Sequence, residues 1–289
     1  MQYISEWFAT GERVQVHGHA PRRIFCKTTG RGPWLTFLHG FPTCSWDWAR
    51  LAPALSAHNR LLFLDFLGFG DSDKPARHRY SIFEQADLVQ AVWRHFGVSE
   101  TGLVAHDYGD TVALELLARQ TEGHLQTEIV GTVLLNGGVY VEHQRPLLIQ
   151  KLLLQPVLGP VLSRVLTERL FKKRFASIFS PAHPISDSEL HQHWLGIVRR
   201  NGKRNYHRVI RYLHERRRHK SRWEAALEDP AHAIRFLWGR VDPVSGANIS
   251  AEIKRRIPSV DLTELADVGH YPQLEVPERV SQFILDTFR

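Results

Sequence analysis

The order of short apolar runs restricts the fold of this chain more than any other feature. Such runs lie at 34–38, 60–65, 102–105 and 129–135, and helical patterns at 83–96 and 111–119 separate the later ones. Apolar runs without polar alternation are typical of strands buried on both faces. Strands that alternate with helices predict a mostly parallel, doubly wound sheet. The sequence therefore predicts an α/β protein.

This alternation stops after Asn136 and resumes with the run 234–238, which is followed by 261–265 and a closing helix at 277–288. The stretch between has apolar residues at helical spacing, as in Tyr206, Val209 and Leu213. We therefore expect a core of residues 1–137 and 231–289 that is interrupted by a helical cap of residues 138–230.

The net charge of +7 and the isoelectric point near 9.6 could indicate a nucleic-acid partner. Eleven Lys and Arg residues and one acid, Glu215, lie between Arg199 and Arg222, however, which leaves 26 basic and 29 acidic residues elsewhere. Helix surfaces often carry Arg and Lys, so we expect no nucleic-acid binding and a solvated outer face of the cap. An anionic substrate or an acidic membrane surface is the lesser alternative.

Cys26 and Cys44 do not have the spacing of a metal-binding motif. The first residues do not show the pattern of a signal peptide, in which a basic stretch precedes an apolar one. No apolar run reaches the roughly 20 residues of a membrane-spanning helix. We expect a cytoplasmic protein that acts on a small molecule and needs no cofactor or metal. The oligomeric state stays open.

The segment Ala105-His-Asp-Tyr-Gly109 follows an expected strand and opens an expected helix. Small residues two before and two after Asp107 are typical of a nucleophile elbow, in which a sharp turn exposes the nucleophile. A carboxylate there is ionised at neutral pH and attacks a saturated carbon, giving an alkyl ester. The alternative is an Asp that only caps the following helix.

Three further motifs end expected strands. The segment His39-Gly-Phe-Pro42 predicts an oxyanion hole formed by the backbone N–H groups of Phe41 and Tyr108. Asp242 follows the run 234–238, and His270 follows the run 261–265. The order Asp107, Asp242, His270 is the nucleophile–acid–base order of α/β hydrolases.

These stretches resemble α/β-hydrolase-fold enzymes of the aspartate-nucleophile branch, which includes epoxide hydrolases and haloalkane dehalogenases. The resemblance is carried by HGFPT, GFGDSDKP, HDYGDTVALELL and HYPQLE. It implies an α/β-hydrolase fold and the three catalytic residues above. The family can also carry the acid of the triad directly after the strand predicted at 129–135. This chain has Asn136 at that position, so the resemblance assigns the acid role to Asp242.

The resemblance also helps to distinguish dehalogenation from epoxide hydrolysis. Dehalogenases hold the halide with a Trp after the nucleophile and often an Asn after His-Gly, whereas this chain has Tyr108 and Phe41. Epoxide hydrolases use cap tyrosines as proton donors, and Tyr212 has a similar spacing from Asp242. Tyr212 could equally only pack the cap, and Tyr140 and Tyr206 are weaker candidates.

An epoxide hydrolase-like enzyme is the leading hypothesis, and a dehalogenase or another α/β hydrolase is the alternative. Asp110 departs from the small residue that epoxide hydrolases usually have in the elbow. A hypothesis of another class is a non-catalytic interaction protein that binds partners through the basic cap surface.

Overall fold

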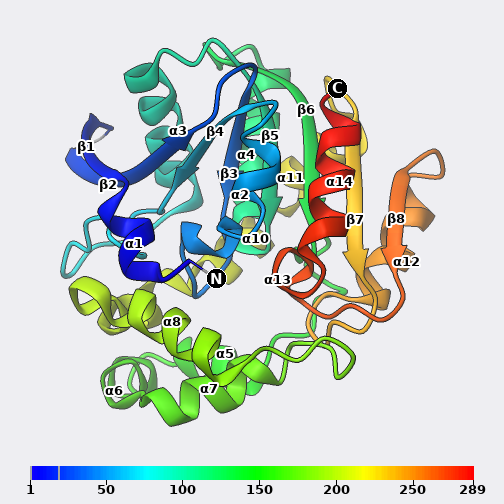
Figure 1. Cartoon of the computed structure of the whole chain (residues 1–289). Helices are drawn as coiled ribbons and strands as arrows, with labels where there is room; N and C mark the ends of the chain where they lie inside the picture. Colours follow the sequence, from blue (N-terminus) through cyan, green and yellow to red (C-terminus); the bar gives the residue numbers. More distant parts are fainter. Residues whose placement is uncertain (1, 19) are drawn as a thin grey trace.

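The computed structural model describes residues 2–18 and 20–289 and contains one eight-stranded sheet (Figure 1). The strand order is β1-β2-β4-β3-β5-β6-β7-β8, with β1 and β2 antiparallel to their neighbours and the other strands parallel. The strands are β1 (Glu12–His17), β2 (Pro21–Thr29), β3 (Trp34–Leu38), β4 (Arg60–Leu64), β5 (Glu100–His106), β6 (Glu128–Leu135), β7 (Ile234–Gly239) and β8 (Asp261–Leu265). The predicted doubly wound α/β class is confirmed.

Successive residues of the central strands enter two different hydrophobic cores, which explains why their sequences are continuously apolar. In β4, Leu61 and Phe63 pack in one core, and Leu62 and Leu64 pack in the other. A strand residue points to the opposite face from its neighbour, so a strand covered on both sides needs apolar residues at every position.

Helices cover both faces of the sheet (Figure 1). One core includes residues of α1 (Ile4–Ala9), α2 (Ala52–Leu55) and α14 (Pro277–Thr287). The other includes residues of α3 (Ile82–Phe96), α4 (Tyr108–Thr121) and α12 (Ala247–Arg256). Two short helical segments, η1 (Ser45–Trp48) and α13 (Pro272–Glu275), complete this part of the chain.

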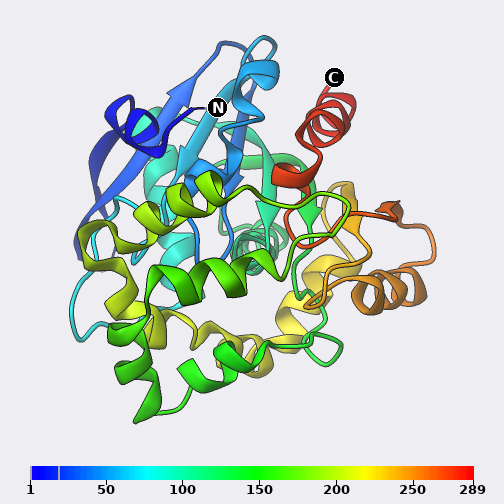
Figure 2. The ribbon, with the colours of Figure 1, turned by 60° about the horizontal axis from the view of Figure 1, so that its bottom comes forward.

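The chain between β6 and β7 is helical. It forms α5 (Leu148–Leu153), α6 (Leu158–Val165), α7 (Glu168–Ala176), α8 (Asp187–Val198), η2 (Arg199–Asn205), α9 (Tyr206–Val209), α10 (Tyr212–Arg218) and α11 (Lys220–Glu228). In Figure 2 the green and yellow-green helices of this segment lie across the molecule in front of the sheet. The last helix of this segment, α11, packs against α4 of the core. Trp223 and Arg222 of α11 donate hydrogen bonds to the Glu115 carboxylate of α4.

The first 30 residues contain elements that the apolar runs do not predict. β1 alternates exposed and buried residues along its length, which is the pattern of an edge strand and not of a buried run. Among residues 2–18 and 20–289, no helix is both long and apolar enough to cross a membrane.

Candidate active site

Asp107 lies in the sharp turn between β5 and α4. Its backbone has φ 50° and ψ −102°, which non-glycine residues rarely adopt and which marks strain at a functional position. A Cβ atom on Gly109 would lie 2.3 Å from the carbonyl oxygen of Leu38, so only glycine fits where α4 starts beside β3. The Asp107 side chain forms no capping hydrogen bond to α4, which argues against the helix-cap alternative.

The Asp107 carboxylate is buried against the loop after β3. The backbone N–H of Phe41 donates a hydrogen bond of 3.0 Å to Asp107 Oδ2. Tyr108, the other predicted donor, begins α4 and is also buried, but its N–H does not bond this carboxylate in the described part of the chain. The structure thus brings one of the two predicted backbone donors into direct contact with Asp107.

Asp242 and His270 meet at the carboxyl ends of β7 and β8. His270 Nδ1 lies 2.7 Å from Asp242 Oδ2, and both side chains are buried. The other oxygen, Asp242 Oδ1, accepts the backbone N–H of Val244 at 2.7 Å. Ser245 Oγ donates to Oδ2 at 2.9 Å. The carboxylate is therefore held in one orientation and fixes the orientation of the imidazole.

Electrostatics favour the ionised form of this pair. Burial alone would lower the pKa of His270, but the charge and hydrogen bond of Asp242, with the charge of Asp107, raise this pKa to about 9. Burial alone would raise the pKa of Asp242, and His270 and Asn136 lower it. The charges of Asp242 and Asp107 therefore favour the cationic form of His270 in the free protein.

A small cavity of about 90 Å³ opens beside His270. Its walls come from the Phe41 loop and from helices α5, α7 and α9, and they are mostly apolar. The side chains are Phe41, Pro42, Leu147, Ile149, Gln150, Leu153, Leu166, Leu170, Phe171, Arg174, Phe175, Ile178, Tyr206, Val244 and His270. Such walls suit a neutral, mainly hydrocarbon molecule.

The three candidate tyrosines have different surroundings. Tyr212 is buried, its ring centroid lies 4.8 Å from that of Tyr108, and its hydroxyl has no hydrogen-bond partner in the described residues. Burial and the Asp107 charge raise the pKa of Tyr212. Tyr206 lines the cavity, but its hydroxyl donates to the carbonyl of Pro42 at 2.8 Å. The Tyr140 hydroxyl also has no partner among the described residues, but its ring packs under Arg256 and does not line the cavity.

Arg216 is a residue of the site that the sequence analysis does not single out. It is buried, and its guanidinium donates to Thr111 Oγ1 at 2.7 Å, to Gln144 Oε1 at 3.0 Å and to the Asp107 carbonyl at 3.4 Å. The expected solvated face of the basic segment is therefore wrong at this position. Arg216 lies three residues after Leu213, so both side chains lie on the same face of a helix. The helical spacing of the apolar residues therefore indicates that Arg216 is on the buried face.

Asp110 is a second buried acid within the electrostatic influence of Arg216. It lies in the first turn of α4, and burial and the nearby Asp107 raise its pKa, while Arg216 lowers it. The net effect raises the pKa of Asp110, which favours its neutral form.

The structure shows no metal-binding arrangement within residues 2–18 and 20–289, where no three His, Cys, Asp or Glu side chains gather suitably. Cys26 and Cys44 are buried free thiols. The arrangement can supply a buried carboxyl group in a strained turn, a histidine–aspartate pair and a backbone N–H donor, which together suit nucleophilic hydrolysis.

Residues 33–277 match the family model described as alpha/beta hydrolase fold. The chain is 41% identical over 283 residues to the LipZ hydrolase of Mycobacterium tuberculosis, covering 98% of this chain and 96% of LipZ. It is 40% identical to the human mesoderm-specific transcript homolog protein, covering 95% of this chain and 84% of that protein. The motifs quoted above also resemble that protein, and the comparison confirms the likeness.

Among solved structures, the haloalkane dehalogenase DbeA from Bradyrhizobium elkani USDA94 superposes with a TM-score of 0.79 and 22% identity, covering 96% of each chain. This similarity concerns the fold. The family model and the long sequence matches establish that the chain belongs to the α/β-hydrolase fold family.

Proposed function

We propose that this α/β hydrolase is a cytoplasmic, epoxide hydrolase-like enzyme in which Asp107, Asp242 and His270 form the catalytic triad. Residues 138–230 serve as the cap, and residues 1–137 and 231–289 form the core. The observation that carries the proposal is the buried, unpartnered hydroxyl of Tyr212 within the electrostatic reach of Asp107. A buried hydroxyl without a partner is costly and suggests that a ligand atom completes it.

In the first half-reaction, a carboxylate oxygen of Asp107 attacks an epoxide carbon and the ring C–O bond breaks. Phe41 N–H bonds Oδ2, so Oδ1 is the oxygen left for attack. Tyr212 donates its proton to the departing ring oxygen, giving a neutral hydroxyalkyl ester of Asp107. Burial raises the pKa of Tyr212, so its hydroxyl is protonated when the ring opens. After the transfer, the Tyr212 phenolate takes up a proton from solvent.

In the second half-reaction, His270 takes a proton from water, and the resulting hydroxide adds to the ester carbonyl of Asp107. The N–H groups of Phe41 and Tyr108 stabilise the oxyanion. The intermediate collapses, the diol oxygen leaves with the proton held by His270, and Asp107 is ionised again. Esterification removes the Asp107 charge, which is one of the charges that raise the pKa of His270. Loss of that charge lowers the pKa of His270, so a larger fraction of the imidazole is neutral and able to take the proton from water.

Neutral epoxides are favoured over haloalkanes by the side chains beside Asp107. Phe41 and Tyr108 present an aromatic ring and a phenol where dehalogenases place N–H donors for the halide, and Tyr108 is buried against Phe66 and Phe69. The apolar cavity favours a small, hydrocarbon-rich epoxide.

The test is to incubate wild type, Asp107→Ala and Asp286→Asn with an epoxide panel, measuring diol, and with a haloalkane panel, measuring halide release. Asp286 is a partly exposed carboxylate far along the chain and serves as the control. We expect diol from wild type and Asp286→Asn and none from Asp107→Ala. Halide release without diol would assign dehalogenation instead. Turnover that survives Asp107→Ala would exclude the covalent mechanism, and no turnover in either panel would favour a binding protein.

A further inference from the structure

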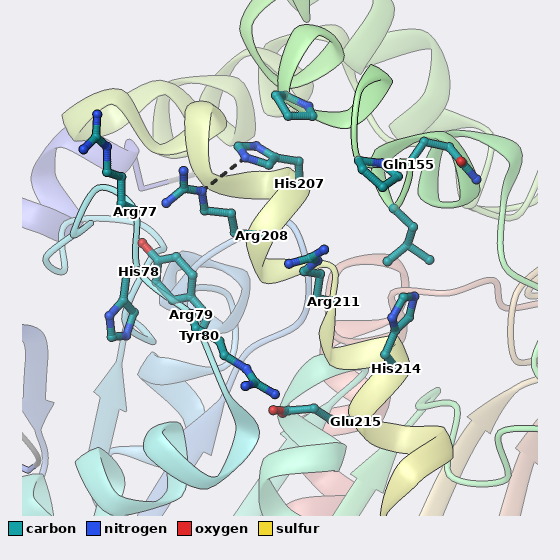
Figure 3. A pocket seen from close by; sticks show the side chains of 13 residues that line it. Arg77, His78, Arg79, Tyr80, Gln155, His207, Arg208, Arg211, His214 and Glu215 are labelled. Atoms are coloured by element: carbon teal, nitrogen blue, oxygen red, sulfur yellow. Dashed lines mark hydrogen bonds between the residues drawn. The ribbon is translucent and has the colours of Figure 1, made fainter.

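A second and larger cavity, of about 590 Å³, lies on the other side of α9 and α10 from the active site (Figure 3). The segment 77–80 forms one wall, and the residues Arg208, Arg211 and His214 form another. Gln155 and Pro156 of the turn between α5 and α6, with Pro160 of α6, close it. Figure 3 shows the labelled cationic side chains of these separate parts of the chain around the cavity, with Arg77 directed away from Arg211 and Arg79 directed towards Glu215.

Four guanidinium groups face this cavity: Arg77 and Arg79 from the core, and Arg208 and Arg211 from the helical segment. None of the four forms an ion pair with another residue of 2–18 or 20–289; Arg208 donates only to His207, at 3.2 Å. Glu215 is the one carboxylate in the lining, and its Oε2 accepts the backbone N–H of Ile82 at 2.7 Å. The cavity therefore holds a local excess of positive charge.

Some other cations of the same basic segment are neutralised within the protein. Arg199 pairs with Asp71 at 2.7 Å, and Arg222 pairs with Glu115 at 2.8 Å. Arg200, Arg204, Arg217 and Arg218 of this segment also form no ion pair among the described residues, so the four arginines of the cavity are distinguished by lining one cavity together. Burial, followed by the charges of Arg208 and Arg164, lowers the pKa of His207, which agrees with a positive potential there.

We infer that this cavity binds a phosphate group carried by a larger organic molecule. Guanidinium groups match phosphate oxygens bidentately, and four of them opposed by one acid suit an anion with more than one negative charge better than a single carboxylate. The volume exceeds what one phosphate fills. Tyr80, Leu154, Pro156 and Pro160 add apolar walls for the organic part.

This site is distinct from the proposed catalytic site, although both share one wall. Arg208 and Arg211 face the phosphate cavity, while Val209, Tyr212 and Arg216 are buried on the opposite side of the same helical segment. The inference stands without the proposed function, because it concerns binding and not the reaction.

The test is calorimetric titration of the intact protein with inorganic pyrophosphate at low ionic strength. The cavity variant is Arg79→Gln/Arg211→Gln, which removes two exposed, unpaired charges from opposite walls. The matched control, Arg217→Gln/Arg218→Gln, removes the same charge from exposed positions of α10 outside the cavity. Thermal unfolding checks that both variants fold.

We expect saturable pyrophosphate binding in wild type and in the control, weakened at least about ten-fold in the cavity variant. Equal weakening in both variants would show general charge attraction and would overturn the site, as would the absence of saturable binding in wild type.

A second arm separates a soluble ligand from a lipid headgroup. Flotation with phosphatidylcholine vesicles containing phosphatidic acid is measured for the same variants. Vesicle binding that pyrophosphate displaces and that the cavity variant loses identifies a lipid phosphomonoester as the source. Pyrophosphate binding without vesicle binding identifies a soluble one. Vesicle binding that the cavity variant retains, with no pyrophosphate binding, contradicts the inference.

Discussion

Asn136 and His270 share one carboxylate oxygen of Asp242. Asn136 Nδ2 donates to Asp242 Oδ2 at 2.9 Å, and His270 Nδ1 lies 2.7 Å from the same atom. Asn136 is itself fixed to β7, because its Oδ1 accepts the N–H of Gly239 at 2.8 Å. Asn136, which cannot act as the acid of the triad, therefore helps to orient the Asp242 carboxylate.

Asn136→Asp tests this arrangement with an almost isosteric side chain. The variant replaces a donor with a second carboxylate beside Asp242, so that one of the two must take up a proton. We expect slower hydrolysis of the alkyl ester, by about ten-fold or more, and accumulation of that ester in rapid-quench mass spectrometry. Ser245→Ala removes only one neutral donor to Asp242 and serves as the milder control. Unchanged ester hydrolysis in Asn136→Asp would contradict the orienting role.

Tyr212→Phe separates chemistry from stability. Its hydroxyl has no partner, so its removal should leave the free energy of unfolding unchanged or slightly higher. The epoxide-opening rate should fall by about 10²–10⁴-fold. Tyr206→Phe is the matched variant, and it should lose about 1 kcal/mol through the bond to Pro42 with little change in the opening rate. Stopped-flow kinetics and denaturant unfolding measure both quantities. A normal opening rate in Tyr212→Phe would remove Tyr212 as the proton donor.

Arg216→Met should reduce the free energy of unfolding by about 1.5–3 kcal/mol, because Thr111 Oγ1 and Gln144 Oε1 lose a charged hydrogen-bond donor. Asp110→Asn in the same chain should recover part of that loss if the Arg216 charge also stabilises the Asp110 carboxyl. A double-mutant cycle in urea measures the coupling between the two positions. Strictly additive losses would mean that Arg216 stabilises the fold only through Thr111 and Gln144.

The pKa of His270 predicts a pH dependence of stability. The ordinary value is 6.5 and the value in the folded protein is about 9, so the folded state binds this proton more tightly. The stabilisation is therefore complete below pH 6.5 and is lost as the pH rises to 9. We expect the difference in unfolding free energy between wild type and His270→Gln to shrink over this range. A difference that stays constant or grows would contradict the raised pKa.

The sequence predicts the strands of the sheet well where one local pattern decides the structure. The run at 34–38 coincides with β3 and the run at 60–65 contains β4, because a strand covered on both faces has a continuously apolar sequence. The stretch 261–265 also coincides with β8, although this edge strand alternates polar and apolar residues. β1 is missed, because an edge strand with one exposed face carries no such run.

Contacts between segments that are distant in the chain could not be predicted from the sequence. Arg216 meets Asp107 across 109 positions, and only the folded α10 brings its side chain beneath the nucleophile turn. The phosphate cavity likewise joins the segment 77–80 to α9 and α10. Counting charges along the chain detects the excess of cations but cannot tell the paired ones from the unpaired ones.

The most direct measurement of the proposed mechanism is the mass of the protein after incubation with an epoxide that the wild type hydrolyses. In His270→Gln, Asp107 still attacks but no base activates water, so the mass should increase by that of one substrate, located by peptide mapping on Asp107. The variant Asp107→Ala/His270→Gln should show no increase. An unmodified His270→Gln protein, or an adduct on another residue, would contradict the covalent mechanism.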